Sequence, residues 1–293
     1  MKAAPAALAA KPPGPPGAPR VLSTHYLQGA PDVTMRAAAP PGASQYYGRR
    51  QGRRLRLGRA RLIDELLPRL SLALPAPGEA LAPASLFGRP ATEFWLEIGF
   101  GAGEHLAAQA DRRRDVGIIG CEPYLNGIAG LLARVDALGL DNVRIFAEDA
   151  RLLLAALPDD CLARVFILFP DPWPKKRHWR RRIVAAATLA ELARVMRAGA
   201  ELRLATDHAE YGQWMLAHVL RAGAFDWLAE RPADWRERPA DWPQTRFETK
   251  AKNAGRASLY LRFRRRARAR ADNPGRIGQK ELAGLAASAY ITG

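Results

Sequence analysis

The chain has 293 residues, with 45 Lys and Arg against 29 Asp and Glu, so its formal net charge is +16. This length fills one large domain or two small ones, and the positive balance predicts a polyanionic partner such as RNA, DNA or an anionic membrane surface. No run of 18 apolar residues occurs, which argues against a membrane-spanning helix. Two cysteines, Cys121 and Cys161, make no disulfide framework, so we expect a reduced, cytoplasmic protein.

Composition divides the chain into three parts. Residues 1–45 are rich in Pro and Ala without periodicity, which predicts a disordered extension. Residues 46–265 alternate apolar blocks with helical patterns and form the expected domain. Residues 266–293 are basic at first and predict a flexible tail that ends in a short helix at 281–290.

Within the domain, buried strands are expected where apolar residues run continuously, at 94–100, 116–122, 142–149, 163–170 and 200–207. Helical spacing occupies 103–114, 124–139, 180–197 and 208–223. Strands alternating with helices of this length predict an α/β fold with a doubly wound, mostly parallel sheet. The segment RASLYLRFR at 256–264 alternates strictly, which predicts an edge or antiparallel strand.

A glycine-rich turn follows the first expected strand. Gly99, Gly101 and Gly103 would let the backbone approach a ligand at the start of a helix. The dinucleotide fingerprint requires a third glycine where this chain has Glu104, so pyrophosphate binding is not predicted. Glu97 precedes the turn, and a carboxylate there suits an ammonium or sulfonium group better than a phosphate.

Acids also end the next two expected strands. Glu122 could accept hydrogen bonds from ribose hydroxyls, and Asp149 could reach an adenine amino group. Because parallel strands end at one edge of a sheet, Glu97, Glu122 and Asp149 should line one crevice. The alternative is that they cap strand-to-helix turns. Strand-end acids are expected to face solvent, so replacing Glu97 or Glu122 should leave the fold intact.

The segment from Glu97 to Gly103, with Glu122 and Asp149, resembles the S-adenosylmethionine site of class I methyltransferases. This resemblance implies S-adenosylmethionine as cofactor and a Rossmann-like, seven-stranded sheet, here with an antiparallel edge strand. It leaves the methyl acceptor open.

The fourth expected strand ends in FPDPW, where Asp171 stands between two prolines and Trp173 follows. This turn lies across the crevice from the expected cofactor. A stiff turn with an aromatic ring offers a wall on which a flat base can stack. The alternative is an ordinary Pro-bounded loop with an exposed Trp.

Two basic runs without acids, 175–182 and 48–59, flank the expected crevice. Such runs often form solvated surface, but two of them beside one crevice predict contacts with a phosphate backbone. The candidate RNA contacts are Arg49, Arg50, Arg53, Arg177, His178, Trp179, Arg180, Arg181 and Arg182.

Four motifs occur in the order of a known family: EIGFGAGEHL from residue 97, FPDPWPKKRHWRRRI from 169, TDH from 206 and TRFETKA from 245. Together they resemble the bacterial tRNA (guanine-N7)-methyltransferases, which methylate a guanosine at position 46 in the tRNA variable loop. The resemblance implies a catalytic Asp171, which would also line the cofactor pocket. It implies substrate contacts by Lys175, Asp207, Thr245, Arg246, Phe247 and Glu248.

Guanine N7 carries a lone pair and no proton, so methylation there needs no general base. The useful groups position the base and stabilise its positive charge. Other RNA base methyltransferases, a non-enzymatic basic RNA-binding protein and a nucleotide-dependent dehydrogenase remain as alternatives; Glu104 argues against the last. The five His and two Cys show no metal-ligand spacing, so no metal is expected. Whether the protein is a monomer or a homodimer is left open.

Overall fold

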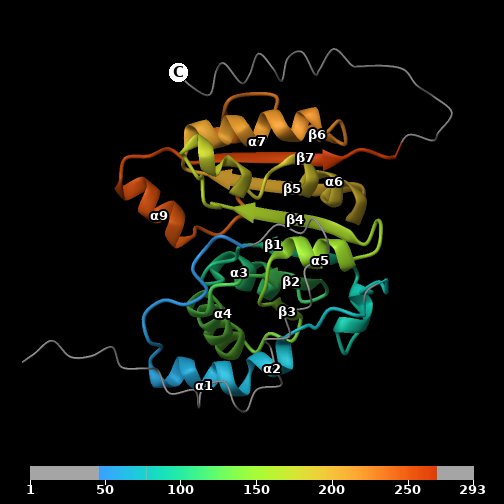
Figure 1. The fold of residues 1–293 in the computed structure, drawn as a ribbon, viewed down its shortest axis with the longest axis vertical. Coiled ribbons are helices and arrows are strands. Elements are labelled where there is room, and N and C mark those ends of the chain that lie inside the picture. Colours follow the sequence, from blue (N-terminus) through green and yellow to red (C-terminus); the bar gives the residue numbers. More distant parts are fainter. Residues whose placement is uncertain (1–45, 77, 269–293) are drawn as a thin grey trace, which may run out of the picture. The chain divides into compact units, whose positions relative to one another are not determined.

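The structure is a computed structural model that describes residues 46–76 and 78–268. The expected extension at 1–45 and the expected helix at 281–290 lie outside the described residues. The described chain forms a seven-stranded sheet in the order β3-β2-β1-β4-β5-β7-β6 (Figure 1). The strands are β1 (Phe94–Ile98), β2 (Gly117–Cys121), β3 (Val143–Phe146), β4 (Leu162–Leu168), β5 (Met196–Thr206), β6 (Phe225–Trp227) and β7 (Leu259–Arg265).

Strands β1 to β5 pair in parallel, as expected. The predicted antiparallel strand is β7, which pairs with β5, and the short β6 pairs antiparallel on the outer side of β7. From β1 the chain builds the sheet outwards through β2 and β3, and then returns to build β4 and β5 on the other side. A ligand crevice is therefore expected where β1 and β4 end.

Helices cover the sheet on both faces. The group α2 (Leu67–Leu70), α3 (Glu104–Arg112) and α4 (Leu125–Leu138) packs on one face, and α1 (Leu57–Glu65) packs against α4. The other face is covered by α5 (Ala150–Ala156), α6 (Ala186–Val195) and α7 (Ala209–Arg221). Outside these layers, the described part of the chain forms the short 3-10 helices η2 (Pro83–Leu86) and η3 (Lys176–Arg181) and the helices α8 (Ala233–Arg236) and α9 (Arg246–Asn253).

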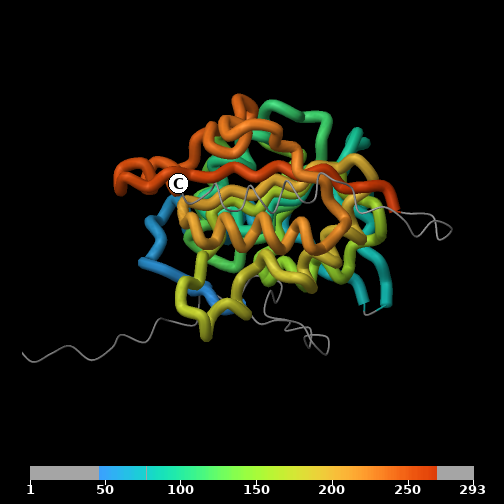
Figure 2. Tube along the Cα trace, turned by 90° about the horizontal axis from the view of Figure 1, so that it is seen from above, coloured from blue at the N-terminus to red at the C-terminus, as the bar shows by residue number. Residues whose placement is uncertain are grey.

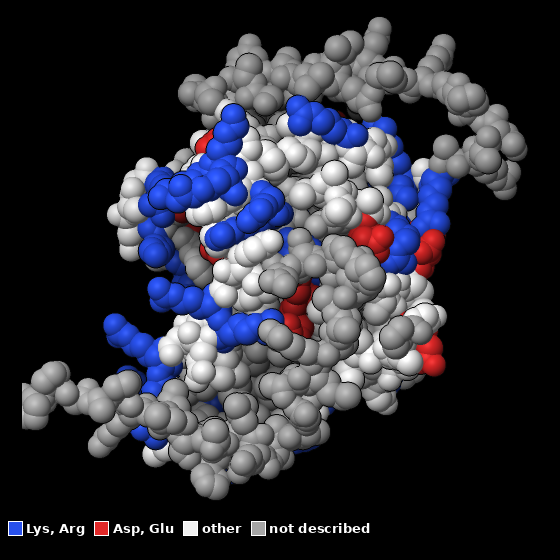
Figure 3. All heavy atoms as spheres, viewed as in Figure 1, with Lys and Arg blue, Asp and Glu red and all other residues white. Residues whose placement is uncertain are grey.

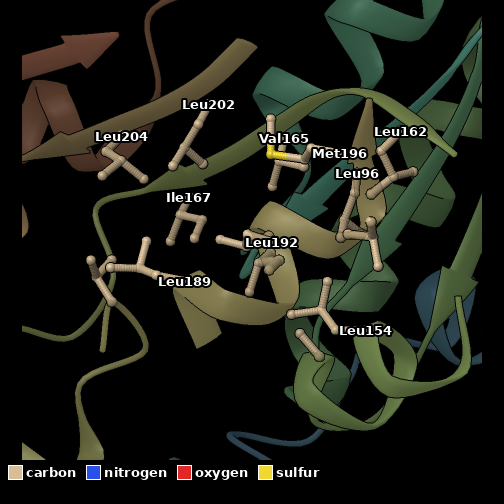
Figure 4. Close-up of a cluster of buried hydrophobic side chains, with 14 of the residues drawn as sticks. Leu96, Leu154, Leu162, Val165, Ile167, Leu189, Leu192, Met196, Leu202 and Leu204 are labelled. Atoms are coloured by element: carbon tan, nitrogen blue, oxygen red, sulfur yellow. The ribbon is translucent and has the colours of Figure 1, made fainter. Parts of the chain in front are cut away.

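Apolar side chains explain why the central strands read as continuous hydrophobic runs. Successive residues point to opposite faces, so Trp95 joins one buried cluster and Leu96 the other. Figure 4 shows the cluster that contains Leu96, where strand residues pack against Leu189 and Leu192 of α6. Leu192 is fully buried, and its truncation to Ala should cost about 2–5 kcal/mol.

The expected helix at 180–197 is wrong in its first part. Residues 176–181 form η3, and α6 begins only at Ala186. The Arg182 guanidinium is fixed to the backbone of the preceding turn, and Ala185 is extended, so the chain turns before α6 starts. The helices α1, α2, α5, α8 and α9 and the strand β6 were not predicted. None of the described helices is long and apolar enough to cross a bilayer.

Candidate active site

The segments that follow β1, β2, β3 and β4 converge at one edge of the sheet. The pKa of Tyr46 reflects this convergence, because its phenol lies close to the carboxylates of residues that were expected to share a crevice. Burial, and then the carboxylates of Glu122, Asp171 and Asp149, raise the pKa of Tyr46 to about 12, while Arg50 opposes the shift. Glu122 and Asp149, two of the predicted cofactor acids, and the predicted catalytic Asp171 therefore act on one group at this edge.

The glycine turn after β1 depends on conformations that other residues rarely adopt. Gly99, Gly101 and Gly103 all have positive φ, at 76°, 56° and 73°. A Cβ at Gly103 would also lie 2.6 Å from the Leu131 side chain on α4, so this residue must lack a side chain. Helix α4 contributes a matching glycine, since a Cβ at Gly127 would lie 2.4 Å from the Gly101 carbonyl oxygen. The turn is thus packed closely against the start of α4.

Glu97 does not face solvent. Its side chain is 4% exposed, and its Oε2 lies 2.7 Å from Nδ1 of His105, which is 2% exposed. Glu122 and Asp149 are buried as well. The expectation that these strand-end acids face solvent is therefore wrong, because the turns and helices that follow the strands close around them.

Glu122 braces the glycine turn. One carboxylate oxygen accepts the Gly101 N–H at 2.9 Å, and the other accepts the Tyr124 N–H at 3.0 Å. Pro123 has no N–H to donate, so Tyr124 supplies the first available donor. Burial raises the pKa of Glu122, the two backbone hydrogen bonds oppose the rise, and Asp171 adds to it. Each oxygen retains a lone pair for a further donor.

Asp149 has the capping role that was considered as an alternative. It precedes α5 and accepts the Arg151 N–H at 3.0 Å, and its carboxylate pairs with the Arg151 guanidinium at 2.9 Å. The neighbouring Glu148 binds both terminal nitrogens of Arg50, at 2.6 and 2.8 Å. Arg50, predicted to contact RNA, is therefore already paired with an acid beside the site.

Asp171 lies in an irregular turn after β4. Phe169 and Trp173 on either side have φ of 51° and 43°, values that are uncommon for residues with side chains. The Phe169 N–H donates to the Ala205 carbonyl, which holds the turn against β5. Asp171 retains exposure, yet desolvation by its surroundings raises the pKa of its carboxyl group above the usual value.

Arg182 was expected to contact RNA, and its burial contradicts this. Its side chain is 0% exposed, and it donates to the Pro172 carbonyl at 2.8 Å and to Glu210 Oε1 at 3.0 Å. Its guanidinium lies 4.6 to 5.0 Å from the ring centroids of three aromatic residues, which are Trp179, Tyr211 and Trp214. Arg182 therefore stabilises the turn that carries Asp171, through its hydrogen bond to the Pro172 carbonyl.

The rest of the basic run divides into stacked and exposed members. Arg181 lies between the Tyr47 and Trp173 rings, at 4.9 and 4.8 Å from their centroids. The exposed members are Lys175, Lys176, Arg177 and Arg180, while His178 and Trp179 are partly buried. Figure 3 shows basic side chains gathered on the left, the side where the parallel strands end in Figure 1.

The segment that begins at Tyr46 lies along the same edge. Figures 1 and 2 show it on the side of the molecule that carries α9. Its backbone docks on the start of α4, because the Leu125 N–H donates to the Arg50 carbonyl and the Asn126 amide bonds both Gly52 and Arg53. Arg49 and Arg53 keep exposed side chains.

Helix α9 carries the TRFE motif to the glycine turn. Thr245 is its N-cap and accepts the Glu248 N–H at 3.3 Å. Phe247 lies over the turn, since a Cβ at Gly101 would be 2.9 Å from its ring, and Arg246 lies beside it. Glu248 points the other way and accepts from Arg238 at 3.1 Å.

Asp207 follows β5 and pairs with Arg256 beyond the end of α9, at 2.8 Å. Of the predicted substrate residues, Arg246 and Phe247 therefore lie beside the glycine turn. Glu248 and Asp207 are paired with arginines, and Lys175 is exposed at the start of η3.

Sequence reasoning missed three residues of this site, His105, Gln109 and Tyr46. His105 and Gln109 are polar residues four apart on the buried face of α3, and a polar pair on such a face signals a hydrogen-bonded partner. Tyr46 had no comparable signal. Among the described residues, no group of three or more His, Cys, Asp or Glu could hold a metal ion.

The fold and the site define a methyltransferase: a family model described as "Putative methyltransferase" matches residues 91–261. Curated relatives narrow the class. The tRNA (guanine-N(7)-)-methyltransferase of Rhodospirillum rubrum is 51% identical over 242 residues, which cover 82% of this chain and 94% of the relative. Enzymes of the same name from Nitrobacter hamburgensis (48%, covering 82% and 94%) and Paramagnetospirillum magneticum (51%, covering 76% and 94%) also match. The chain belongs to the tRNA (guanine-N(7)-)-methyltransferase family.

Proposed function

We propose that the protein transfers a methyl group from S-adenosylmethionine to N7 of a guanosine in the tRNA variable loop, at position 46. The observation that carries the proposal is the convergence of an acid-lined glycine turn, the Asp171 turn and α9 at one basic edge of the sheet.

The residues fit this cofactor. The glycine turn exposes backbone where side chains would intrude, and the acids around it suit a ligand with sulfonium and ammonium charges. When bound, S-adenosylmethionine supplies an electrophilic methyl group. We assign its binding to Glu97, Gly99, Gly101, Gly103, Glu122, Asp149 and Asp171. Glu122 keeps a lone pair on each oxygen, so it can brace the turn and accept ribose hydroxyls together.

The protein contributes to the reaction by positioning the guanine and by stabilising the positive charge that forms on it. Since guanine N7 has no proton, Asp171 need not act as a base. An ionised Asp171 can accept hydrogen bonds from N1 and N2 of the guanine and stabilise the cationic purine as it forms. Its partly desolvated position strengthens that electrostatic effect, and the rigid turn holds it in place.

Substrate contacts are assigned to the groups around α9. Phe247, 40% exposed over the glycine turn, offers a ring for a base, and Arg246 beside it offers a cation. Thr245 is buried as the N-cap and acts by fixing α9. Asp207, Glu248 and Lys175 complete the assigned set.

The tRNA backbone is assigned to the exposed cations at this edge. They include Arg49, Arg53, Arg177 and Arg180, whose side chains are free to meet phosphates. A tRNA substrate and two free cysteines suit the reducing cytoplasm, where we place the protein.

The test is direct. Unmodified tRNA is incubated with protein and labelled methyl donor, digested, and analysed for 7-methylguanosine. A tRNA whose guanosine at position 46 is replaced by adenosine serves as the matched control. Label in 7-methylguanosine with the first tRNA only supports the proposal; label in another nucleoside, or equal label in both tRNAs, contradicts it.

A further inference from the structure

One buried contact beside the glycine turn, between Glu97 and His105, is not explained by the proposed chemistry. Glu97 is a carboxylate with almost no exposure, and a buried charge is costly unless a donor satisfies it. The donor is His105, on the first turn of α3, whose Nδ1 lies 2.7 Å from Glu97 Oε2.

The other side of the imidazole fixes which nitrogen carries the proton. Gln109 Nε2 lies 3.3 Å from His105 Nε2 and 2.8 Å from the Asp241 carbonyl oxygen. An amide NH₂ has two donors, so one can go to each acceptor. His105 Nε2 then accepts, and Nδ1 carries the proton that Glu97 receives. Phe166 packs its ring 4.5 Å from the imidazole centroid and Trp242 lies 6.3 Å away, which limits rotation.

We propose that His105 is a positioning residue for the cofactor: its Nδ1–H donates to Glu97 and holds that carboxylate oriented in the glycine turn, with Gln109 setting the tautomer. The proposal rests on the proposed function, because it assigns Glu97 to a cationic ligand. It also links the cofactor turn to the segment before α9, since Gln109 bonds the Asp241 backbone and Trp242 packs on the imidazole.

The test uses two isosteric variants. Asn places its amide NH₂ near the position of Nδ1 and keeps the donor to Glu97, whereas Gln places its amide near Nε2 and loses that donor. Calorimetry on the full chain should show that His105→Gln raises the Kd for S-adenosylmethionine about tenfold or more, the effect of one charge-assisted hydrogen bond. His105→Asn should stay within about threefold of wild type. At saturating donor, the single-turnover methylation rate should be nearly unchanged in both.

If His105 served only to fill the core, both variants would behave alike, so equal affinities would overturn the proposal. Thermal unfolding identifies a variant that fails to fold. For that case Gln109→Leu leaves the imidazole in place and removes its tautomer-setting partner, together with the hydrogen bond to the Asp241 carbonyl. Unchanged donor affinity in this variant would also refute the assignment. A wild-type protein that binds the donor but makes no 7-methylguanosine would defeat the proposed function and leave the calorimetric test of His105 in force.

Discussion

Arg182 gives the sharpest test of how the basic run is divided between folding and binding. Replacing it with Ala removes a charge-assisted hydrogen bond to the Pro172 carbonyl and the centre of a three-ring aromatic cluster. Losing a buried half of an ion pair can cost 3–5 kcal/mol, but here Glu210 is 49% exposed and returns to water readily. Arg182 Nη1 has no hydrogen-bond partner in the described part of the chain, which also reduces the net stabilisation.

We therefore expect Arg182→Ala to destabilise the protein by about 2–4 kcal/mol. At this domain size that corresponds to a Tm lower by about 5–15 °C. Arg182→Lys should lie between Ala and wild type, since an ammonium cannot reproduce the planar fork. The matched control is the exposed Arg180→Ala, which should change stability by less than about 0.5 kcal/mol.

Thermal unfolding and tRNA titration below the Tm together separate the two roles. Arg182→Ala should keep the salt dependence of tRNA binding, whereas Arg180→Ala should weaken it. A Tm for Arg182→Ala equal to that of Arg180→Ala would refute the assignment of Arg182 to the folded core.

Three further outcomes are expected. Asp171→Asn should bind tRNA normally, because phosphates dominate affinity, but methylate about 10²–10³-fold more slowly in single turnovers at saturating donor; near-normal rates would exclude Asp171 from the chemistry. Since the pKa values of Asp171 and Glu122 are raised, the rate should fall as pH decreases through a range above that of ordinary carboxylates. A pH–rate profile that stays flat down to the ordinary carboxylate range would contradict this. Combined Arg177→Ala and Arg180→Ala should lower the log–log salt slope of tRNA binding by about 0.7–0.9 per lost contact, and an unchanged slope would mark both as solvated surface.

The sheet could be predicted from the sequence because its signal is local. Each parallel strand is covered on both faces, so each reads as an apolar run whose end can be located within a few residues. The glycine turn could be predicted equally well, since backbone with positive φ strongly favours glycine at those positions. Helix α9 was missed because it is polar, short and held by its contacts with the turn instead of by an apolar face.

Burial of charged groups could not be predicted from the same patterns. Arg180 and Arg182 are near neighbours in one run, and only the fold distinguishes them, because Tyr211 and Trp214 approach Arg182 from α7, about thirty residues later. Glu97 was misjudged for a similar reason. The sequence alone predicts that an acid at a strand end is exposed, because it does not show that α3 places His105 against Glu97.

The contact between Phe247 and Gly101 restricts how the sequence can diverge. A Cβ at position 101 would meet the Phe247 ring at 2.9 Å, so a larger residue in the turn requires either that the ring moves or that α9 carries a smaller residue. Removing the ring would relieve the collision but not the backbone strain of φ 56°, which costs roughly 1–2 kcal/mol for a residue with a side chain. The two positions should therefore show epistasis, with the Phe247→Ala background tolerating Gly101→Ala better than the wild type does. Substitutions in α9 and in the glycine turn are therefore expected to depend on each other.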